Sequence, residues 1–193
     1  TRGVFAGAYA HPAASNIIDY ITIATVGDAA DFGDLTVARW YLSGCGSLTR
    51  GLWAGGKAAP LQDTIDYSTI ASTGDATDFG NLSVARSGIA AFSSATRGVF
   101  AGGEIASETD EISYVTISST GDTTDFGNLT DAREHGAATS NKTRGVYGGG
   151  SGLVDTVEYV TIASTGDATD FGDLTDARLG LGAFSDSHGG LQN

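Results

Sequence analysis

One motif occurs four times in this chain, and the repetition limits the folds that the chain can adopt. Close copies read STGDATDFGNLSVAR at 72–86, STGDTTDFGNLTDAR at 119–133 and STGDATDFGDLTDAR at 164–178, and a looser copy, TVGDAADFGDLTVAR, spans 25–39. A second marker, Thr-Arg-Gly, begins at 1, 49, 96 and 143, which gives a period of 47 residues with small length changes in the first and last copies. An active site is needed once, whereas a structural joint is needed once per unit, so the motif predicts a joint.

Each unit contains four short segments that have the composition of β-strands. They are represented by Gly88–Ser94 (GIAAFSS), Thr96–Gly103 (TRGVFAGG), Ile18–Thr25 (IDYITIAT) and Thr169–Thr175 (TDFGDLT). β-branched and aromatic residues favour strands, and the Ser-Thr-Gly-Asp stretch favours a turn. No segment has a sustained helical period, so we predict almost no helix.

Four antiparallel strands in a repeat of about 40–50 residues are typical of a β-propeller blade. We therefore expect one all-β domain over residues 1–193, a four-bladed β-propeller with repeats at approximately 1–48, 49–95, 96–142 and 143–187. A solenoid is the competing interpretation, but its repeats are usually shorter or helical. The last segment, Leu179–Ser187, resembles a first strand with no second strand after it. We expect it to pair with the N-terminal blade and to close the ring, which would remove the open sheet edges.

The composition disfavours several classes of function. A net charge of −13 disfavours nucleic-acid binding, because phosphate affinity needs clustered Lys and Arg. No apolar run approaches the roughly 18 residues of a membrane span, so we expect no membrane insertion. The single cysteine, Cys45, lies among small residues of a predicted innermost strand and is interpreted as a core residue rather than a nucleophile.

The two faces of the predicted ring differ in how much their sequences vary. The TRG and STGD turns share one face, and the opposite face carries the varied loops at Ala8–Asn16, Lys57–Asp63, Glu104–Asp110 and Ser151–Asp155 together with the links between blades. Varied loops on a rigid repeated scaffold commonly form binding surfaces. The candidate ligand-binding residues are Trp40, Tyr41, Glu134 and His135. Unconstrained drift of the loops is the alternative, and Trp53, on a second strand, is expected in the core.

Charged residues recur at fixed places in the repeat. Four arginines end the units (Arg39, Arg86, Arg133 and Arg178), and four acids begin the Asp-Phe-Gly segments (Asp31, Asp78, Asp125 and Asp170). Because arginine forms planar bidentate pairs with carboxylates, we predict structural ion pairs that join neighbouring blades. A repeated basic ligand site is the alternative.

Neither a catalytic group nor a cofactor site is indicated. The acidic turn GDATDFGD at 166–173 lacks the ligand spacing and the late Glu of a calcium loop, so we expect no metal, although weak calcium binding stays open. The histidines occupy non-equivalent positions, and no Ser-His-Asp or Cys-His grouping is evident.

The units resemble kelch-type repeats. The likeness is carried by FAGG at Phe100–Gly103, the IDY segment, DFGDLT and the closing Ala-Arg, whereas the usual tryptophan of the fourth strand is Phe32, Phe79, Phe126 or Phe171 here, and the first copy has AGA for the glycine doublet. The sequence of the units is also similar to repeats in virion structural proteins of tailed phages of marine cyanobacteria. In the first copy, Phe5, Tyr20, Asp31, Phe32 and Arg39 carry that similarity.

This resemblance implies an extracellular module on a virion surface, with no enzyme activity. We therefore expect a non-enzymatic binding or structural module whose variable face contacts a cell-surface glycan or a neighbouring virion protein. A structural spacer is one alternative. A glycan-active enzyme is a weaker one, for which only Glu134, His135 and Asp110 could supply the chemistry.

Overall fold

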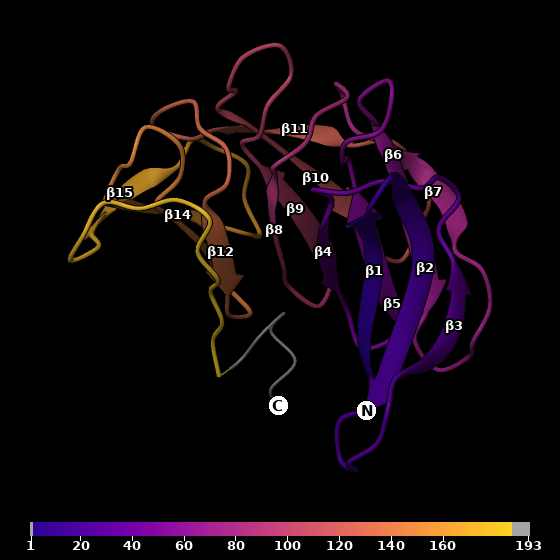
Figure 1. Cartoon of the computed structure of the whole chain (residues 1–193). Coiled ribbons are helices and arrows are strands. Elements are labelled where there is room, and N and C mark those ends of the chain that lie inside the picture. The colour runs from indigo at the N-terminus through magenta and orange to yellow at the C-terminus, as the bar shows by residue number, and fades with distance from the viewer. Residues whose placement is uncertain (1, 187–193) are drawn as a thin grey trace.

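The computed structural model describes residues 2–186, which form strands, turns and loops (Figure 1). No helix occurs in this range, so none of it crosses a membrane as a helix. The strands form four antiparallel sheets in chain order, one per repeat. This arrangement confirms the prediction of an all-β chain of repeated antiparallel sheets.

The sheets are numbered from the N-terminus. Sheet 1 consists of β1 (Arg2–Ala10), β2 (Ala13–Thr22) and β3 (Ala30–Asp34). Sheet 2 consists of β4 (Ser43–Gly46), β5 (Arg50–Ala54), β6 (Thr64–Thr69) and β7 (Thr77–Asn81). Sheet 3 consists of β8 (Ala90–Ser93), β9 (Arg97–Ala101), β10 (Glu111–Thr116) and β11 (Thr124–Asn128). Sheet 4 consists of β12 (Ala137–Ser140), β13 (Arg144–Gly148), β14 (Thr156–Thr161) and β15 (Thr169–Asp173).

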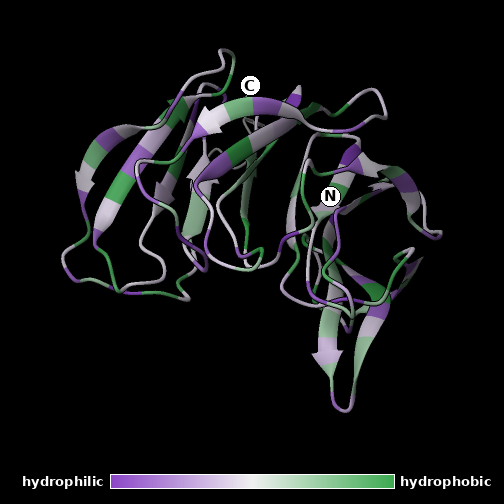
Figure 2. Ribbon diagram, turned by 90° about the horizontal axis from the view of Figure 1, so that it is seen from above, coloured by the Kyte–Doolittle hydropathy of each residue, from purple (hydrophilic) through white to green (hydrophobic). Residues whose placement is uncertain are grey.

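The sheets follow one another along an open arc, with sheet 1 and sheet 4 at its two ends (Figures 1 and 2). The first strands β4, β8 and β12 lie side by side on the inner side of the arc. Small residues such as Gly44, Cys45 and Gly46 build these strands, because neighbouring backbones approach closely there. Along the strands, apolar residues alternate with polar ones (Figure 2), as the pleat requires.

The expected closing strand is not formed in the described part of the chain. Sheet 1 has three strands instead of four, and residues 179–186 contain no strand, while Ser187 lies outside the described residues. The Ser185 hydroxyl donates to the Ser140 carbonyl oxygen at 2.6 Å, so this segment lies beside β12, whereas β1 lies at the other end of the arc (Figure 1).

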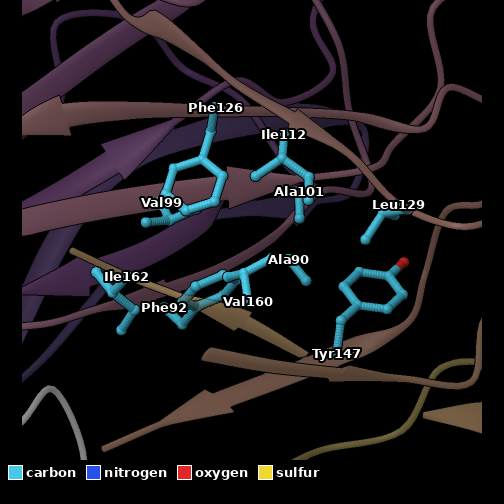
Figure 3. Packing of buried hydrophobic residues seen from close by; sticks show 10 residues of the cluster. All are labelled: Ala90, Phe92, Val99, Ala101, Ile112, Phe126, Leu129, Tyr147, Val160 and Ile162. Atoms are coloured by element: carbon cyan, nitrogen blue, oxygen red, sulfur yellow. The ribbon is translucent and has the colours of Figure 1, made fainter. Parts of the chain in front are cut away.

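The core lies between consecutive sheets. Figure 3 shows the cluster between sheets 3 and 4, in which Phe126 and Phe92 pack with Tyr147, Val160 and Ile162 of the following sheet. The two preceding interfaces contain equivalent clusters around Phe79 and around Phe32. The phenylalanine of the Asp-Phe-Gly segment is therefore the residue that each sheet inserts against the next one.

The first repeat departs from the other three in its hairpin. The stretch Ala8–Asn16, expected as a loop, extends β1 and β2, with Tyr9 paired to Ala14 and Ala10 to Ala13. In the other copies a second glycine with positive φ ends the strand against the preceding link. At Gly56, for example, a Cβ would lie 2.9 Å from the Trp40 carbonyl oxygen. The first copy has Ala8 there, and within residues 2–186 no link from another sheet lies against it, so the strand continues.

Candidate functional site

The fourfold motif forms the joints between sheets. The Gly74 amide of one STGD turn donates to the Phe32 carbonyl oxygen of the preceding sheet at 2.7 Å, and the Asp75 carboxylate accepts from the Asp34 amide at 3.1 Å. The next two joints repeat this geometry through Gly121 and Gly166. A Cβ on Gly33 would lie 2.5 Å from the Gly74 carbonyl, so the backbones meet too closely for any other residue. The repeated sequence motif therefore has a structural role.

Buried arginines form a second connection between sheets. Arg39, which follows β3, reaches into sheet 2, where its Nη1 lies 2.9 Å from Asp66 Oδ2, and both side chains are fully buried. Asp66 also accepts from the hydroxyl and the amide of Thr36, at 2.6 Å and 3.2 Å. Burial lowers the pKa of the Arg39 guanidinium, and the charge of Asp66 opposes that shift.

The same connection recurs with different carboxylates. Arg133 pairs with Glu158, the repeat equivalent of Asp66. In sheet 3 the equivalent residue is Ser113, whose hydroxyl accepts from Arg86 Nη2 at 2.7 Å, and Glu111 supplies the carboxylate from two residues earlier, at 3.6 Å. The loss of the acid at one position is thus compensated on the same strand.

The acids that pair with arginine differ from those expected. No ion pair within residues 2–186 involves Asp31, Asp78, Asp125 or Asp170. Two of these short side chains turn back onto their own strand: Asp78 accepts from the Gly80 amide at 3.2 Å and Asp170 from the Gly172 amide at 3.0 Å. The partners that sequence reasoning missed had a visible signal, because Asp66 and Glu158 are the only charged residues in their strands, β6 and β14. Arg178, at the end of the arc, is exposed.

The links between sheets bring aromatic rings together on one face of the molecule. Trp40 pairs with Lys57 of the neighbouring loop through two backbone hydrogen bonds, at 3.1 Å and 2.6 Å. Its ring lies 5.2 Å from that of Tyr9, at the extended hairpin of sheet 1. A surface hollow of about 550 Å³ is lined by Ala8, Tyr9, Trp40 and Tyr41. Tyr9 was not among the residues expected from the sequence, because its stretch was interpreted as a loop.

The row of rings continues across the next link. The Tyr41 ring lies 5.2 Å from that of His135, and a smaller hollow of about 220 Å³ borders both residues. We name Tyr9, Trp40, Tyr41 and His135 the aromatic face. The structure therefore places three of the four candidate ligand-binding residues in one contiguous surface.

Backbone geometry holds two of these rings in place. Tyr41 and His135 have φ angles of 55° and 54°, a region that glycine adopts far more readily, and the equivalent residues of the other links are Gly88 and Gly180. The Gly88 amide donates to the Tyr41 carbonyl at 3.1 Å, and the His135 amide donates to the Gly88 carbonyl at 3.0 Å. A non-glycine residue in this conformation costs about 1–3 kcal/mol and is retained where the surroundings enforce it, which is a common feature of binding sites.

The fourth candidate, Glu134, lies beside the aromatic face. Its Oε2 is 3.3 Å from His135 Nε2, and its backbone amide donates to the Ser151 hydroxyl at 3.0 Å. No hydrogen bond or ion pair links Asp110 to Glu134 or His135 among the described residues. Within the same range, no three His, Cys, Asp or Glu side chains gather as metal ligands would.

Cys45 lies away from this face, on the inner strand β4. Burial raises the pKa of its thiol to about 12, so the thiolate is scarce at neutral pH. Trp53 is buried between sheets 1 and 2, which confirms its expected place in the core.

A comparison with protein-family models gives no match, and a comparison with curated proteins gives no significant one.

Proposed function

We propose that this protein is a non-enzymatic binding module that recognises a carbohydrate through its aromatic face. The observation that carries the proposal is the contiguous row of Tyr9, Trp40 and Tyr41 around one surface hollow. Aromatic rings present a rigid apolar surface with a polar edge, which suits the apolar C–H faces and hydroxyl groups of sugar rings. The strained conformation of Tyr41 supports a role beyond packing, because glycine occupies the equivalent place in two links.

The proposal includes a propeller-type ring in which the segment 179–187 becomes the missing strand of sheet 1. The four-bladed ring expected from the sequence would pair the segment with sheet 1 of the same chain, and pairing with sheet 1 of a second copy would complete that sheet equally well. The resemblance to kelch-type repeats supports the ring, and the resemblance to phage virion repeats supports a place on the surface of a particle outside the cell. The carbohydrate would then be a cell-surface glycan, and a neighbouring virion protein is the alternative partner.

A structural spacer is the second candidate. It is favoured by one observation, namely that the Gly-Asp turns at Gly74, Gly121 and Gly166 and the arginines Arg39, Arg86 and Arg133 serve joints between sheets. A spacer needs no exposed aromatic row, so the two candidates differ in what the aromatic face contributes.

The test is binding of the labelled protein to intact bacterial cells and to their extracted polysaccharides. Trp40→Ala and Tyr41→Ala are compared with Leu153→Ala, a matched control that also removes an exposed side chain at positive φ from a loop on the same side of the molecule. We expect saturable binding that falls at least about tenfold in the first two variants and is kept in the control. Equal binding by all three variants would contradict the proposed face, and absence of binding to every preparation would favour the spacer.

A further inference from the structure

The two ends of the arc expose the two halves of an inter-sheet interface. On sheet 4, Phe171 is 57% exposed, whereas its repeat equivalent Phe126 is 2% exposed. On sheet 1, Phe5 is 59% exposed, whereas its equivalent Phe100 is fully buried. We name the two surfaces the trailing face (Phe171, Arg178 and Phe184) and the leading face (Phe5, Asp19 and Ile23). Each face carries the apolar residues that its equivalents bury against a neighbouring sheet.

The two faces are also complementary in charge. Arg39 pairs with Asp66 of the following sheet, and the repeat equivalents of these residues at the ends of the arc are Arg178 and Asp19. Arg178 is exposed and Asp19 is half-buried, and neither forms an ion pair within residues 2–186. The two partners of one further inter-sheet ion pair are therefore both in the chain, Arg178 at the sheet 4 end of the arc and Asp19 at the sheet 1 end.

Sheet 1 has room for the strand that it lacks. A cavity of about 270 Å³ between sheets 1 and 2 is bordered by Phe32, Cys45, Gly51 and Trp53. In sheet 3, Phe92 of the first strand projects over Gly145 of the following sheet, and the same position in a first strand of sheet 1 would project over Gly51. The cavity thus lies where a phenylalanine of a missing strand would pack.

The segment 182–185 has the sequence for this strand and no strand partner. Its Phe184, the repeat equivalent of Phe92, is 91% exposed. Its Ser185 continues a ladder along the inner row, because the Ser93 hydroxyl donates to the Gly46 carbonyl at 2.7 Å, the Ser140 hydroxyl to the Ser93 carbonyl at 2.8 Å and the Ser185 hydroxyl to the Ser140 carbonyl at 2.6 Å. The segment therefore already lies where the first strand of a fifth sheet would lie.

We infer that the trailing face of sheet 4 docks on the leading face of sheet 1 of a second copy of this chain. The segment 182–185 becomes the missing strand against β1 of the second copy, Phe184 enters the cavity over Gly51, and Arg178 pairs with Asp19. A second copy fits because the segment is held on β12, while β1 of the same chain lies at the opposite end of the arc (Figure 1). The contact continues the interface that the chain already forms three times, and it goes beyond carbohydrate binding. Such a head-to-tail contact closes into a ring of copies or extends into a filament.

The test uses charge reversal on each face, with the mass of the particles in solution measured by sedimentation. Arg178→Asp and Asp19→Arg each place like charges across the interface, so each variant alone is expected to lose at least about tenfold in association constant relative to the unmodified protein. Mixing the two variants restores opposite charges at every junction of an alternating assembly, and association is expected to return. Lys142→Asp, a charge reversal in the turn between β12 and β13, is the control and should associate like the unmodified protein.

Three results would overturn the inference. The first is a single-chain mass for the unmodified protein at every concentration, which would indicate closure within one chain. The second is unchanged association of both charge-reversed variants. The third is a mixture that stays as dissociated as its components, since closure within one chain predicts no rescue by mixing. The circular dichroism spectrum of each variant verifies that its sheets have formed, and glycan binding is measured separately, so failure here leaves the proposed carbohydrate function standing.

Discussion

The interior joints and the two ends of the arc contain the same sequence motifs in different surroundings. Phe126 and Phe171 both lie in the stretch Thr-Asp-Phe-Gly, yet one is buried and the other is exposed. Likewise, the Gly74 amide donates to the Phe32 carbonyl oxygen of the preceding sheet at 2.7 Å, whereas the equivalent Gly27 amide makes no such bond to another sheet within residues 2–186. The less similar first copy, with Val26 in place of the usual Thr, forms the turn that no other sheet contacts within residues 2–186. Burial in this fold is therefore set by the adjacent sheet rather than by the local sequence.

The largest difference between a joint and an end is expected at the acid that pairs with arginine. Asp66→Ala leaves the Arg39 guanidinium buried without its partner and also removes the hydrogen bonds from Thr36, so the free energy of unfolding should fall by about 3–5 kcal/mol. Asp19→Ala, at the equivalent end position, should change it by less than about 0.5 kcal/mol. Urea unfolding at low protein concentration measures both, and equal losses would contradict the comparison.

The phenylalanine of the Asp-Phe-Gly segment gives the second contrast. Phe126→Ala opens a cavity in the cluster between sheets 3 and 4 and should lower the free energy of unfolding by about 3–5 kcal/mol. Phe171→Ala removes an exposed ring and should cost less than about 0.5 kcal/mol in the isolated chain. The two variants differ only in the sheet they belong to, so thermal unfolding midpoints that shift equally would show that sheet 4 is covered in solution.

A smaller contrast is expected at the glycine of the Thr-Arg-Gly marker, which lies in β1 at Gly3 and in β13 at Gly145. A Cβ at Gly145 would overlap the ring of Phe92, so Gly145→Ala forces a shift in the core and should cost about 1–3 kcal/mol. At Gly3 the nearest atom to a Cβ would be Ile21 Cγ1 at 3.3 Å, a side-chain atom that can shift by a few tenths of an ångström. Gly3→Ala should therefore cost less than about 0.5 kcal/mol in urea unfolding. A larger loss there would indicate a neighbour that the isolated arc does not have.

The smallest effect on stability is expected on the aromatic face. Tyr41→Gly removes the strain that a side chain causes at positive φ, but it also gives the unfolded chain more backbone freedom. Because these two effects oppose each other, the free energy of unfolding should change by less than about 1 kcal/mol. Tyr41→Val places a β-branched side chain in that conformation and should cost about 1–2 kcal/mol. If valine were tolerated as well as glycine in calorimetric unfolding, the link would not be strained and the argument for a functional Tyr41 would weaken.

Residues whose role is local were predictable from the sequence, whereas residues whose partners lie in another sheet were not. The strand of Thr-Asp-Phe-Gly, the turn of Ser-Thr-Gly-Asp and the core position of Trp53 follow from composition and period alone. The partner of Arg39 did not, because several acids per repeat compete for it and only the packing of sheet 2 on sheet 1 selects Asp66. Tyr9 was missed because the effect of Ala8 on the hairpin depends on whether a link lies against it.

The period of 47 residues establishes that the chain builds one small antiparallel sheet four times over and joins the sheets by a repeated turn. The sequence is sufficient for this because strand and turn preferences act over a few residues and therefore recur wherever the sequence motif recurs. The angle between sheets, the open arc and the meeting of Tyr41 with His135 depend on contacts between repeats. Such contacts form only when side chains of two sheets pack against one another. The sequence pattern of one repeat does not specify how far apart, or at what angle, two sheets lie.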